Sequence, residues 1–430
     1  MVKFLHKILA HFAKRIIKKY NPLIIGITGS VGKSSTKQAI YTVLRDKFDV
    51  RCSLKNYNNE IGLPLTIFDS LSPGRNIEGW LKILFRVSKM LLFRVNYPEI
   101  LILEMAADHP GDIKYLTNIA TPKIGVITAI GLTHTEFFKN INSVTKEKQV
   151  LVKNLEKKDW AILNVDDKRV EAMSDKTSAQ ILTFGLSEKA NVQATEIKID
   201  QELLGEGTCK VKGLTFKINY RGSIVPVFLP NIISQAQIYS VLGAIAVGLT
   251  LNLNLIDIIK TFSKYKALPG RLTIIPGIRE TLLLDDTYNS SPSAVKISLL
   301  SLNKIKIASK AKKWVVLGDM LELGELSTQA HQEIGQEVGK MKPDYLIVVG
   351  EEAQKISEGA QNSGFSPEKI FSFSNSLEAG NFLESNISKG DILLIKGSQG
   401  IRLEKIVKKL MLKPDQAKKL LVRQDKKWLR

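Results

Sequence analysis

The feature that most constrains this sequence is an apolar run leading directly into a glycine-containing turn. Leu23–Ile27 has the composition of a buried strand, and a helical stretch from Ser35 to about Phe48 follows the turn. Glycines let backbone N–H groups approach an anion, and the N-terminus of a helix adds a favourable dipole. A plain tight turn is the alternative, but strand, loop and helix in this order favour a phosphate-binding loop. Its predicted anion-binding residues are Gly29, Ser30, Gly32, Lys33, Ser34 and Ser35.

Two loop side chains and one strand-end carboxylate suit a nucleotide with its metal ion. Lys33 can reach the β- and γ-phosphates, and the Ser34 hydroxyl can bind Mg²⁺. Glu104 ends the apolar run Ile100–Leu103. A carboxylate at the C-terminal end of a buried strand is placed to be a second metal ligand. An ordinary surface glutamate is the alternative interpretation.

His134 and Lys148 are less clear from the residues alone. His134 follows the predicted strand 124–130, so a metal ligand and a structural histidine both stay open. Lys148, in the segment Lys146-Glu147-Lys148-Gln149, has the surroundings of an exposed helical lysine. A functional role for Lys148 therefore needs support from elsewhere.

The order of elements predicts an α/β protein. Apolar strand candidates alternate with helical patterns, which indicates a central phosphate-loop ATPase domain with a mostly parallel sheet. Residues 190–229 predict a small antiparallel patch. A hinge-like segment, 267–271, then precedes a C-terminal Rossmann-like α/β domain. The predicted divisions are a basic amphipathic helix at 1–21, an ATP-binding domain at 22–268, a C-terminal domain at 269–412 and a basic tail at 413–430.

The formal net charge of +20 favours an anionic partner. Much of this charge lies in two apolar and basic segments, 2–20 and 80–97, and in the tail. Either the helix at 2–20 packs on the ATP-binding domain, or it lies on an anionic membrane surface. The two cysteines fit a reducing compartment, and we find neither a secretory signal nor a membrane span.

The motifs resemble, in their order along the chain, those of the Mur ligase family, and most closely its MurF branch. The resemblance covers roughly residues 22–412. The similar segments are the loop at 28–35, Asn56–Gly62, Glu104–Ile113, Leu268–Arg271, Asp285–Pro292, Gly318–Gly324 and Lys396–Ser398.

This resemblance implies an ATP-dependent ligase of peptidoglycan precursor synthesis, which adds D-alanyl-D-alanine to a UDP-muramoyl-tripeptide through an acyl phosphate. It implies ATP and two Mg²⁺ ions as cofactors. Ser34 and Glu104 would hold one ion, and His134 and a carbamylated Lys148 would hold the other. The implied catalytic residues are Lys33, Lys148 and His134.

The resemblance also implies roles for residues after the hinge, and it implies the substrates. Asp286 would contact the ATP ribose, Asn289 would lie near the adenine or the reacting end, and Arg271 would join the nucleotide-binding set. The implied partners are UDP-muramoyl-peptide and D-Ala-D-Ala, without nucleic acid. We expect a monomer in the cytoplasm, with peripheral contact with anionic membrane at its inner face as a further expectation.

Two departures from the family pattern keep alternatives open. The family usually carries an N-terminal domain for the UDP-sugar, whereas this loop begins near residue 26, so we expect that domain to be missing. A Mur-type ligase with a different acceptor is therefore the first alternative. The family's Gly-x-His-Asn-x-x-Asn segment aligns with 234–240, where Gln237 is the candidate replacement for one Asn. A non-ligase P-loop ATPase at the membrane surface ranks last, because it would not need the polar strand ends after Gly270.

Overall fold

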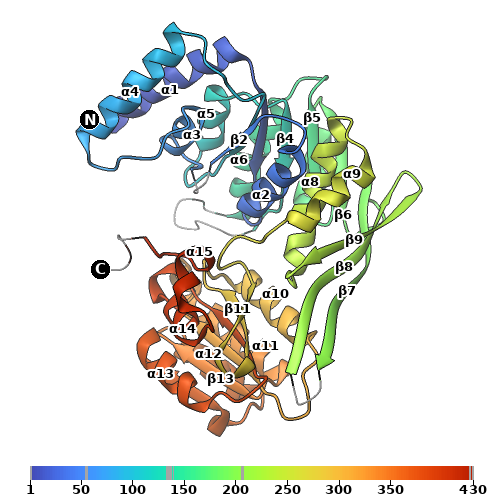
Figure 1. Ribbon diagram of the computed structural model, residues 1–430, viewed down its shortest axis with the longest axis vertical. Helices are drawn as coiled ribbons and strands as arrows, with labels where there is room; N and C mark the ends of the chain where they lie inside the picture. The colour runs from blue at the N-terminus through green and yellow to red at the C-terminus, as the bar shows by residue number, and fades with distance from the viewer. Residues whose placement is uncertain are drawn as a thin grey trace. The chain divides into compact units, whose positions relative to one another are not determined.

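The computed structural model describes residues 2–53, 57–131, 138, 140–204, 208–425 and 428, which form two compact units (Figure 1). The first unit contains Met1–Glu196, Phe216–Val227 and Gln237–Tyr265. The second contains Ile197–Thr215, Phe228–Ala236 and Lys266–Arg430. The last boundary between the units, at Tyr265 and Lys266, lies close to the predicted hinge at 267–271. The units are nevertheless not the contiguous segments 22–268 and 269–412 that the sequence predicted. The difference is that Ile197–Thr215 and Phe228–Ala236, which precede the predicted hinge, belong to the second unit.

The first unit is built on a parallel sheet, as expected. Within the described residues, nine strands form one sheet in the order β2-β3-β1-β4-β5-β6-β7-β8-β9. Its parallel strands are nearly continuous runs of Ile, Leu and Val, the pattern of strands buried on both faces. They are β1 (Leu23–Thr28), β2 (Val50–Cys52), β3 (Ile100–Glu104), β4 (Ile124–Ile127), β5 (Trp160–Asn164) and β6 (Gln180–Gly185).

Three longer strands form the patch predicted at 190–229. They are β7 (Val192–Leu204), β8 (Thr208–Tyr220) and β9 (Ser223–Pro230). A two-residue turn, Arg221-Gly222, joins β8 to β9, and its φ values of 48° and 79° are those of a tight hairpin turn.

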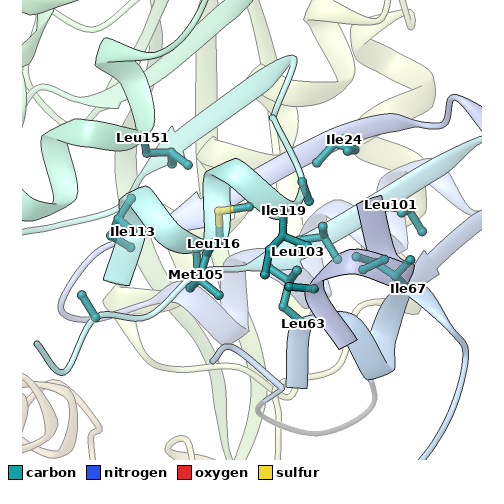
Figure 2. Close-up of a cluster of buried hydrophobic side chains, with 14 of the residues drawn as sticks. Ile24, Leu63, Ile67, Leu101, Leu103, Met105, Ile113, Leu116, Ile119 and Leu151 are labelled. Carbon is teal, nitrogen blue, oxygen red and sulfur yellow. The ribbon is translucent and has the colours of Figure 1, made fainter. Parts of the chain in front are cut away.

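Helices cover the sheet of the first unit. They are α1 (Val2–Tyr20), α2 (Lys33–Leu44), α3 (Gly62–Ile67), α4 (Ile77–Leu92), α5 (Asp112–Ile119), α6 (Ile141–Lys153), α7 (Lys168–Glu171), the 3-10 turns η1 (Ala172–Lys176) and η3 (Phe262–Lys264), α8 (Gln235–Thr250) and α9 (Leu255–Thr261). Figure 2 shows side chains of β1, β3, α3 and α5 meeting in one hydrophobic core.

The predicted helix at 2–20 is confirmed as α1. Its apolar side chains Leu9, Ala13 and Ile16 are fully buried in the same core as β3 and α5. Of the two interpretations left open by the sequence, the structure therefore supports packing on the ATP-binding unit for the apolar face of α1.

The second unit has its own sheet. Within the described residues its order is β10-β11-β15-β12-β13-β14, with only β10 antiparallel to its neighbour. The strands are β10 (Thr273–Pro276), β11 (Leu282–Asp286), β12 (Lys313–Gly318), β13 (Tyr345–Val349), β14 (Ile370–Phe373) and β15 (Ile392–Lys396). Successive residues of β12 enter different cores, Trp314 and Val316 on one face and Val315 and Leu317 on the other. Both faces of this sheet are therefore covered, as a Rossmann-like domain requires.

The helices of the second unit pack on the two faces of this sheet. They are α10 (Pro292–Asn303), α11 (Ser327–Met341), α12 (Gln354–Asn362), α13 (Ser376–Asn386), α14 (Glu404–Leu410) and α15 (Ala417–Leu420), with 3-10 turns η4 (Ile278–Glu280), η5 (Gly324–Leu326), η6 (Pro367–Lys369), η7 (Gln399–Ile401) and η8 (Pro414–Gln416). In the described part of the chain, no helix combines the length and apolarity needed to cross a bilayer.

Candidate active site

Two glycines shape the turn between β1 and α2. Gly29 has a φ of 147°, and a Cβ there would lie only 2.0 Å from Thr128 Oγ1. Gly32, with φ 90°, precedes the first residue of α2. The Ser30 N–H donates to the Ala129 carbonyl at 2.7 Å, which fixes the loop against the end of β4. The turn therefore needs glycine where the phosphate-loop prediction placed it.

The Lys33 ammonium lies over its own loop. Its Nζ donates to the carbonyl oxygens of Gly29, at 2.7 Å, and Ser30, at 3.4 Å. Ser34 and Ser35 are buried in the first turn of α2. A phosphate group bound to the N–H groups of this loop would meet the Lys33 ammonium directly.

Glu104 lies beside the loop at the end of β3 and is only 2% exposed. Both of its carboxylate oxygens are 3.0 Å from Ser34 Oγ. Lys37 Nζ lies 3.4 Å from Oε2, and Asn58 Nδ2 donates to Oε1 at 3.2 Å. Burial alone raises the pKa of Glu104, but the charges of Lys37 and Lys33 and the two donated hydrogen bonds bring it below its usual value. Glu104 is therefore an ionised carboxylate next to the loop.

The pair formed by Ser34 and Glu104 has the donor chemistry of a magnesium site. A hydroxyl and a carboxylate are hard oxygen ligands, which Mg²⁺ prefers. Among the described residues, no group of three His, Cys, Asp or Glu side chains gathers around a point. An ion here would take its other ligands from phosphate and water, as Mg²⁺ does in nucleotide sites. The residues present thus fit the ion that the sequence predicted.

Lys148 is buried, so its interpretation as an exposed helical lysine is wrong. It lies on α6 and is 2% exposed. Burial lowers the pKa of Lys148 to about 7, and the positive charge of Lys33 adds to this effect against the opposing charges of Glu147 and Asp108. A lysine with this pKa is partly uncharged at neutral pH, unlike a solvated lysine.

Glu147 ties the segment after Glu104 to the helix that carries Lys148. Its carboxylate accepts hydrogen bonds from the N–H groups of Gly111 and Ile113, both at 2.8 Å, at the start of α5. This is a favourable place for an anion, because the N-terminus of a helix has unpaired N–H groups. The buried lysine is consequently held in a fixed place on the β3–α5 side of the unit.

Two further predictions of the first unit have different outcomes. His134 lies outside the described residues, so its role as a metal ligand stays a prediction. Gln237 is buried, and its side-chain oxygen accepts from Tyr265 Oη at 2.7 Å. The same hydroxyl lies 3.5 Å from the Ser35 carbonyl oxygen, so Tyr265 connects Gln237 with the start of α2.

In the second unit, Asp286 and Asn289 meet at Lys396. Lys396 Nζ lies 2.7 Å from Asp286 Oδ2 and 3.0 Å from the Asn289 carbonyl oxygen. Asp286 also accepts from Ser298 Oγ at 2.6 Å and from the Leu272 N–H at 3.1 Å. Both Asp286 oxygens are thus already hydrogen-bonded within the unit, whereas the Asn289 side chain is exposed.

Arg271 and Asp285 also lie near the carboxyl end of β11. The Arg271 guanidinium lies 4.0 Å from the centre of the Tyr288 ring, a cation–π contact. Asp285 is fully buried, and burial raises its pKa to about 6 in spite of two hydrogen bonds from Thr287. The conformation of the loop from Asp285 to Asn289 is therefore fixed by contacts with neighbouring side chains.

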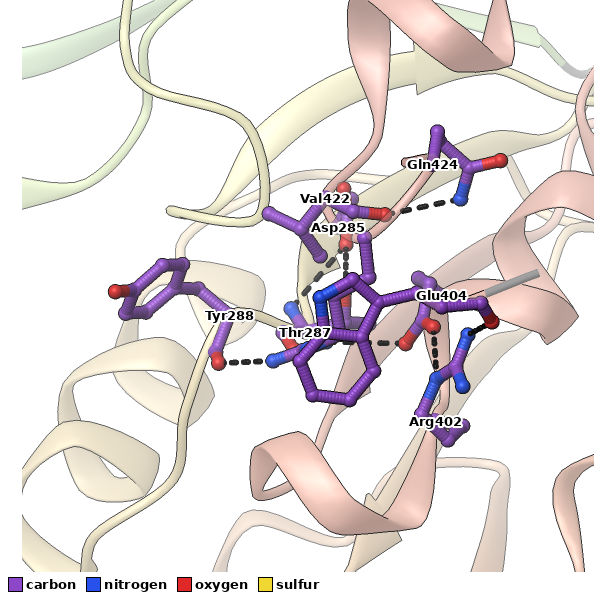
Figure 3. A network of polar contacts seen from close by, with 9 residues as sticks. Asp285, Thr287, Tyr288, Arg402, Glu404, Val422 and Gln424 are labelled. Carbon is purple, nitrogen blue, oxygen red and sulfur yellow. Dashed lines mark hydrogen bonds and ion pairs between the residues drawn. The ribbon is translucent and has the colours of Figure 1, made fainter. Parts of the chain in front are cut away.

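Arg423, in the predicted basic tail, packs within the second unit. Arg423 Nη1 lies 3.0 Å from Glu404 Oε2 and donates to the Thr287 carbonyl at 2.9 Å, and Nη2 donates to the Tyr288 carbonyl. Figure 3 shows Glu404, Arg402, Thr287 and Tyr288 in this network. The side chains of Arg423 and Glu404 are 5% and 0% exposed. Arg423 suits this place because a guanidinium has several N–H donors for a buried carboxylate and two loop carbonyls.

Sequence reasoning missed three residues of the first unit. Lys37 follows Ser34 by three positions on α2, so helical spacing could have placed its ammonium on the same face. Asn58 lies in the segment Asn56–Gly62, to which the family resemblance assigned no individual roles. Nothing in the sequence marks Glu147, because its partners belong to a helix start more than thirty residues away.

Comparison with protein families identifies both units. Residues 27–77 and 83–248 match the Mur ligase middle domain, and residues 270–399 match the Mur ligase glutamate ligase domain. Together the matched segments cover most of the chain.

Individual relatives agree with these matches. The chain is 29% identical to the UDP-N-acetylmuramoyl-tripeptide–D-alanyl-D-alanine ligase of Bacillus subtilis, over 94% of this chain and 79% of that protein. It is 27% identical to the ligase of the same name from Mycobacterium leprae, over 88% and 72% of the two chains. The structure resembles the MurF ligase of Thermotoga maritima in complex with ADP, with TM-score 0.75, 27% identity, and coverage of 94% and 83%.

Proposed function

This chain belongs to the Mur ligase family, and on that basis we propose that it is an ATP-dependent ligase that adds D-alanyl-D-alanine to a UDP-muramoyl-tripeptide. The observation that carries the proposal is the contact of Glu104 with Ser34 at 3.0 Å. It joins a strand-end carboxylate to the phosphate loop, which is the arrangement that nucleotide-bound Mg²⁺ needs.

The reaction has two steps. The γ-phosphoryl group of ATP passes to the terminal carboxylate of the tripeptide, which gives an acyl phosphate and ADP. The amino group of D-alanyl-D-alanine then attacks the carbonyl carbon, phosphate leaves, and the nitrogen loses a proton. Both steps bring anions together, so positively charged and N–H groups fixed in advance should lower the barrier.

The residues of the first unit are suited to that task. The loop N–H groups between Gly29 and Ser35 bind phosphate, and the Lys33 ammonium stabilises the charge on the group being transferred. Ser34 and Glu104 would hold one Mg²⁺, which when bound neutralises phosphate charge. Lys37 keeps Glu104 ionised and correctly oriented through their ion pair.

We further infer that Lys148 is carbamylated. Carbamylation requires a neutral amine, which attacks the carbon of CO₂ to form an N–C bond and loses one proton. With a pKa of about 7, roughly half of the Lys148 amines are neutral at pH 7, whereas an ordinary lysine is almost wholly protonated there. The resulting carboxylate would supply a ligand for a second Mg²⁺, together with His134.

In the second unit, Asp286, Asn289 and Arg271 remain our candidates for the nucleotide contacts. Asp286 and Asn289 share the partner Lys396 at the carboxyl end of β11, where ligands bind in open α/β sheets. Of these three candidates, only Asn289 is exposed, so it is the first to test.

Assays of phosphate release separate the proposed function from its alternatives. Release that requires both UDP-muramoyl-tripeptide and D-Ala-D-Ala, with formation of the pentapeptide product, supports the proposal. Release with ATP that ignores both substrates would instead favour a P-loop ATPase. Turnover with another amine or another carboxylate acceptor would favour the ligase with a different substrate. Sedimentation velocity tests the accompanying proposal that the protein is a monomer.

A further inference from the structure

The helix α4 exposes a row of large apolar side chains. Ile77, Leu81, Phe85 and Leu92 are between 60% and 77% exposed, and Phe93 beyond the helix end is 63% exposed. Their spacing of four, four and seven residues places the first four on one side of a helix. The opposite side of α4 packs against the core through Ile83, Val87 and Met90. This helix therefore has two apolar faces, and only one is used by the described part of the fold.

Basic side chains flank the exposed apolar row. They are Lys82, Arg86, Lys89 and Arg94, all exposed. Two of them have nearby anions, because Lys82 pairs with Glu78 at 2.6 Å and Arg86 with Asp69 at 2.9 Å. The neighbouring helix α1, seen beside α4 in Figure 1, contains no acidic residue. Its exposed side chains add Lys7, Lys14, Arg15 and Lys18.

The helix α4 is firmly fixed in this orientation. Lys19 Nζ donates to the carbonyl oxygens of Met90, Leu91 and Phe93 at 2.7–3.0 Å, which caps the C-terminus of α4. Tyr20 Oη donates to the Met90 carbonyl at 2.8 Å. The exposed row is consequently a preformed surface of the first unit and not a frayed helix end.

We propose that α4 docks this protein on an anionic lipid bilayer, lying in the plane of the interface with its apolar row among the acyl chains. An in-plane helix needs an apolar face beside a basic one, and α4 has both. Anionic headgroups complement the cations of α4 and α1. The sequence suggested residues 2–20 and 80–97 together, but the apolar face of α1 is buried, so α4 supplies the inserting residues and α1 supplies charge.

No residue of α4 takes part in the phosphate-loop contacts described above, and the docking does not depend on which acceptor the ligase uses. Its loss should leave turnover of soluble substrates unchanged. Failure of the docking proposal and failure of the proposed function are therefore distinguishable.

The test is co-sedimentation of the full chain with vesicles of phosphatidylcholine containing increasing phosphatidylglycerol, at low and high salt. Replacing Leu81 and Phe85 with Gln removes apolar insertion but no charge, and replacing Lys82 and Lys89 with Gln removes charge only. The matched control is Leu377→Gln, at a residue that is 65% exposed on α13. We expect the partition coefficient to fall by about tenfold or more per apolar side chain and about fivefold per lysine. Only the effect of the lysines should weaken as salt rises.

Several results would overturn the proposal. The first is wild-type protein that stays in the supernatant on strongly anionic vesicles at low salt. The second is the Leu81→Gln, Phe85→Gln variant binding as tightly as the wild type. A third is concentration-dependent dimerisation of the wild type that the same variant abolishes, because the apolar row would then be a protein interface. Circular dichroism and ATP turnover of each variant confirm that the fold is intact.

Discussion

Replacing Lys148 with Met should make the unmodified protein more stable while abolishing ligation. Lys148 is 2% exposed, and its pKa is lowered from 10.5 to about 7. At pH 7 this shift corresponds to roughly 4 kcal/mol of folding free energy that the buried lysine costs. Met has a similar length without a charge and adapts to irregular cavities, so the variant should recover much of that energy.

The pH dependence has a definite sign. Between pH 7 and 10.5 the unfolded chain binds more protons at Lys148 than the folded chain, so the stability of the wild type rises with pH there. The advantage of Lys148→Met should accordingly shrink from about 4 kcal/mol at pH 7 to about 1 kcal/mol at pH 10.

Urea unfolding in bicarbonate-free buffer at these two pH values measures the effect. Lys146→Met, at an exposed position of the same helix, is the control and should change stability little at either pH. A Lys148→Met protein that is less stable than wild type at pH 7, or whose advantage is independent of pH, would refute the reasoning. Ligase activity that survives the substitution would refute carbamylation, whereas partial rescue of Lys148→Ala by acetate would support it.

Other substitutions test the remaining contacts. Lys33→Ala should lower ATP turnover by orders of magnitude with an unchanged circular dichroism spectrum, and near-normal ligation would exclude the phosphate-loop assignment. Glu104→Gln should raise the Mg²⁺ concentration for half-maximal turnover by about tenfold or more; an unchanged Mg²⁺ titration would contradict its role. Arg423→Met should reduce the free energy of unfolding by about 3 kcal/mol, because it removes one partner of the buried Glu404 carboxylate. If urea unfolding shows no loss, the tail is not part of the folded second unit.

Local features of the fold and of the site were available from the sequence. The strand, the glycine turn and the helix at 23–44 are contiguous, so their order alone predicted this local structure, and with it a candidate phosphate loop. The apolar runs likewise predicted most strands and the carboxylate at the end of β3. These predictions succeed because each depends on neighbouring residues, whose backbone geometry and burial pattern repeat with a short period.

Only the tertiary structure decided which side chains lie together and which faces are covered. Helical spacing shows that α1 and α4 each have apolar residues along one side. Packing against elements distant in the sequence decides that the apolar side of α1 is buried, whereas a row of apolar side chains on α4 is exposed. Burial of Lys148, the contact of Ser34 with Glu104 across 70 positions, and the engagement of Arg423 depend in the same way on elements brought together by folding. A pKa follows burial and neighbouring charges in space, and a linear pattern does not contain either.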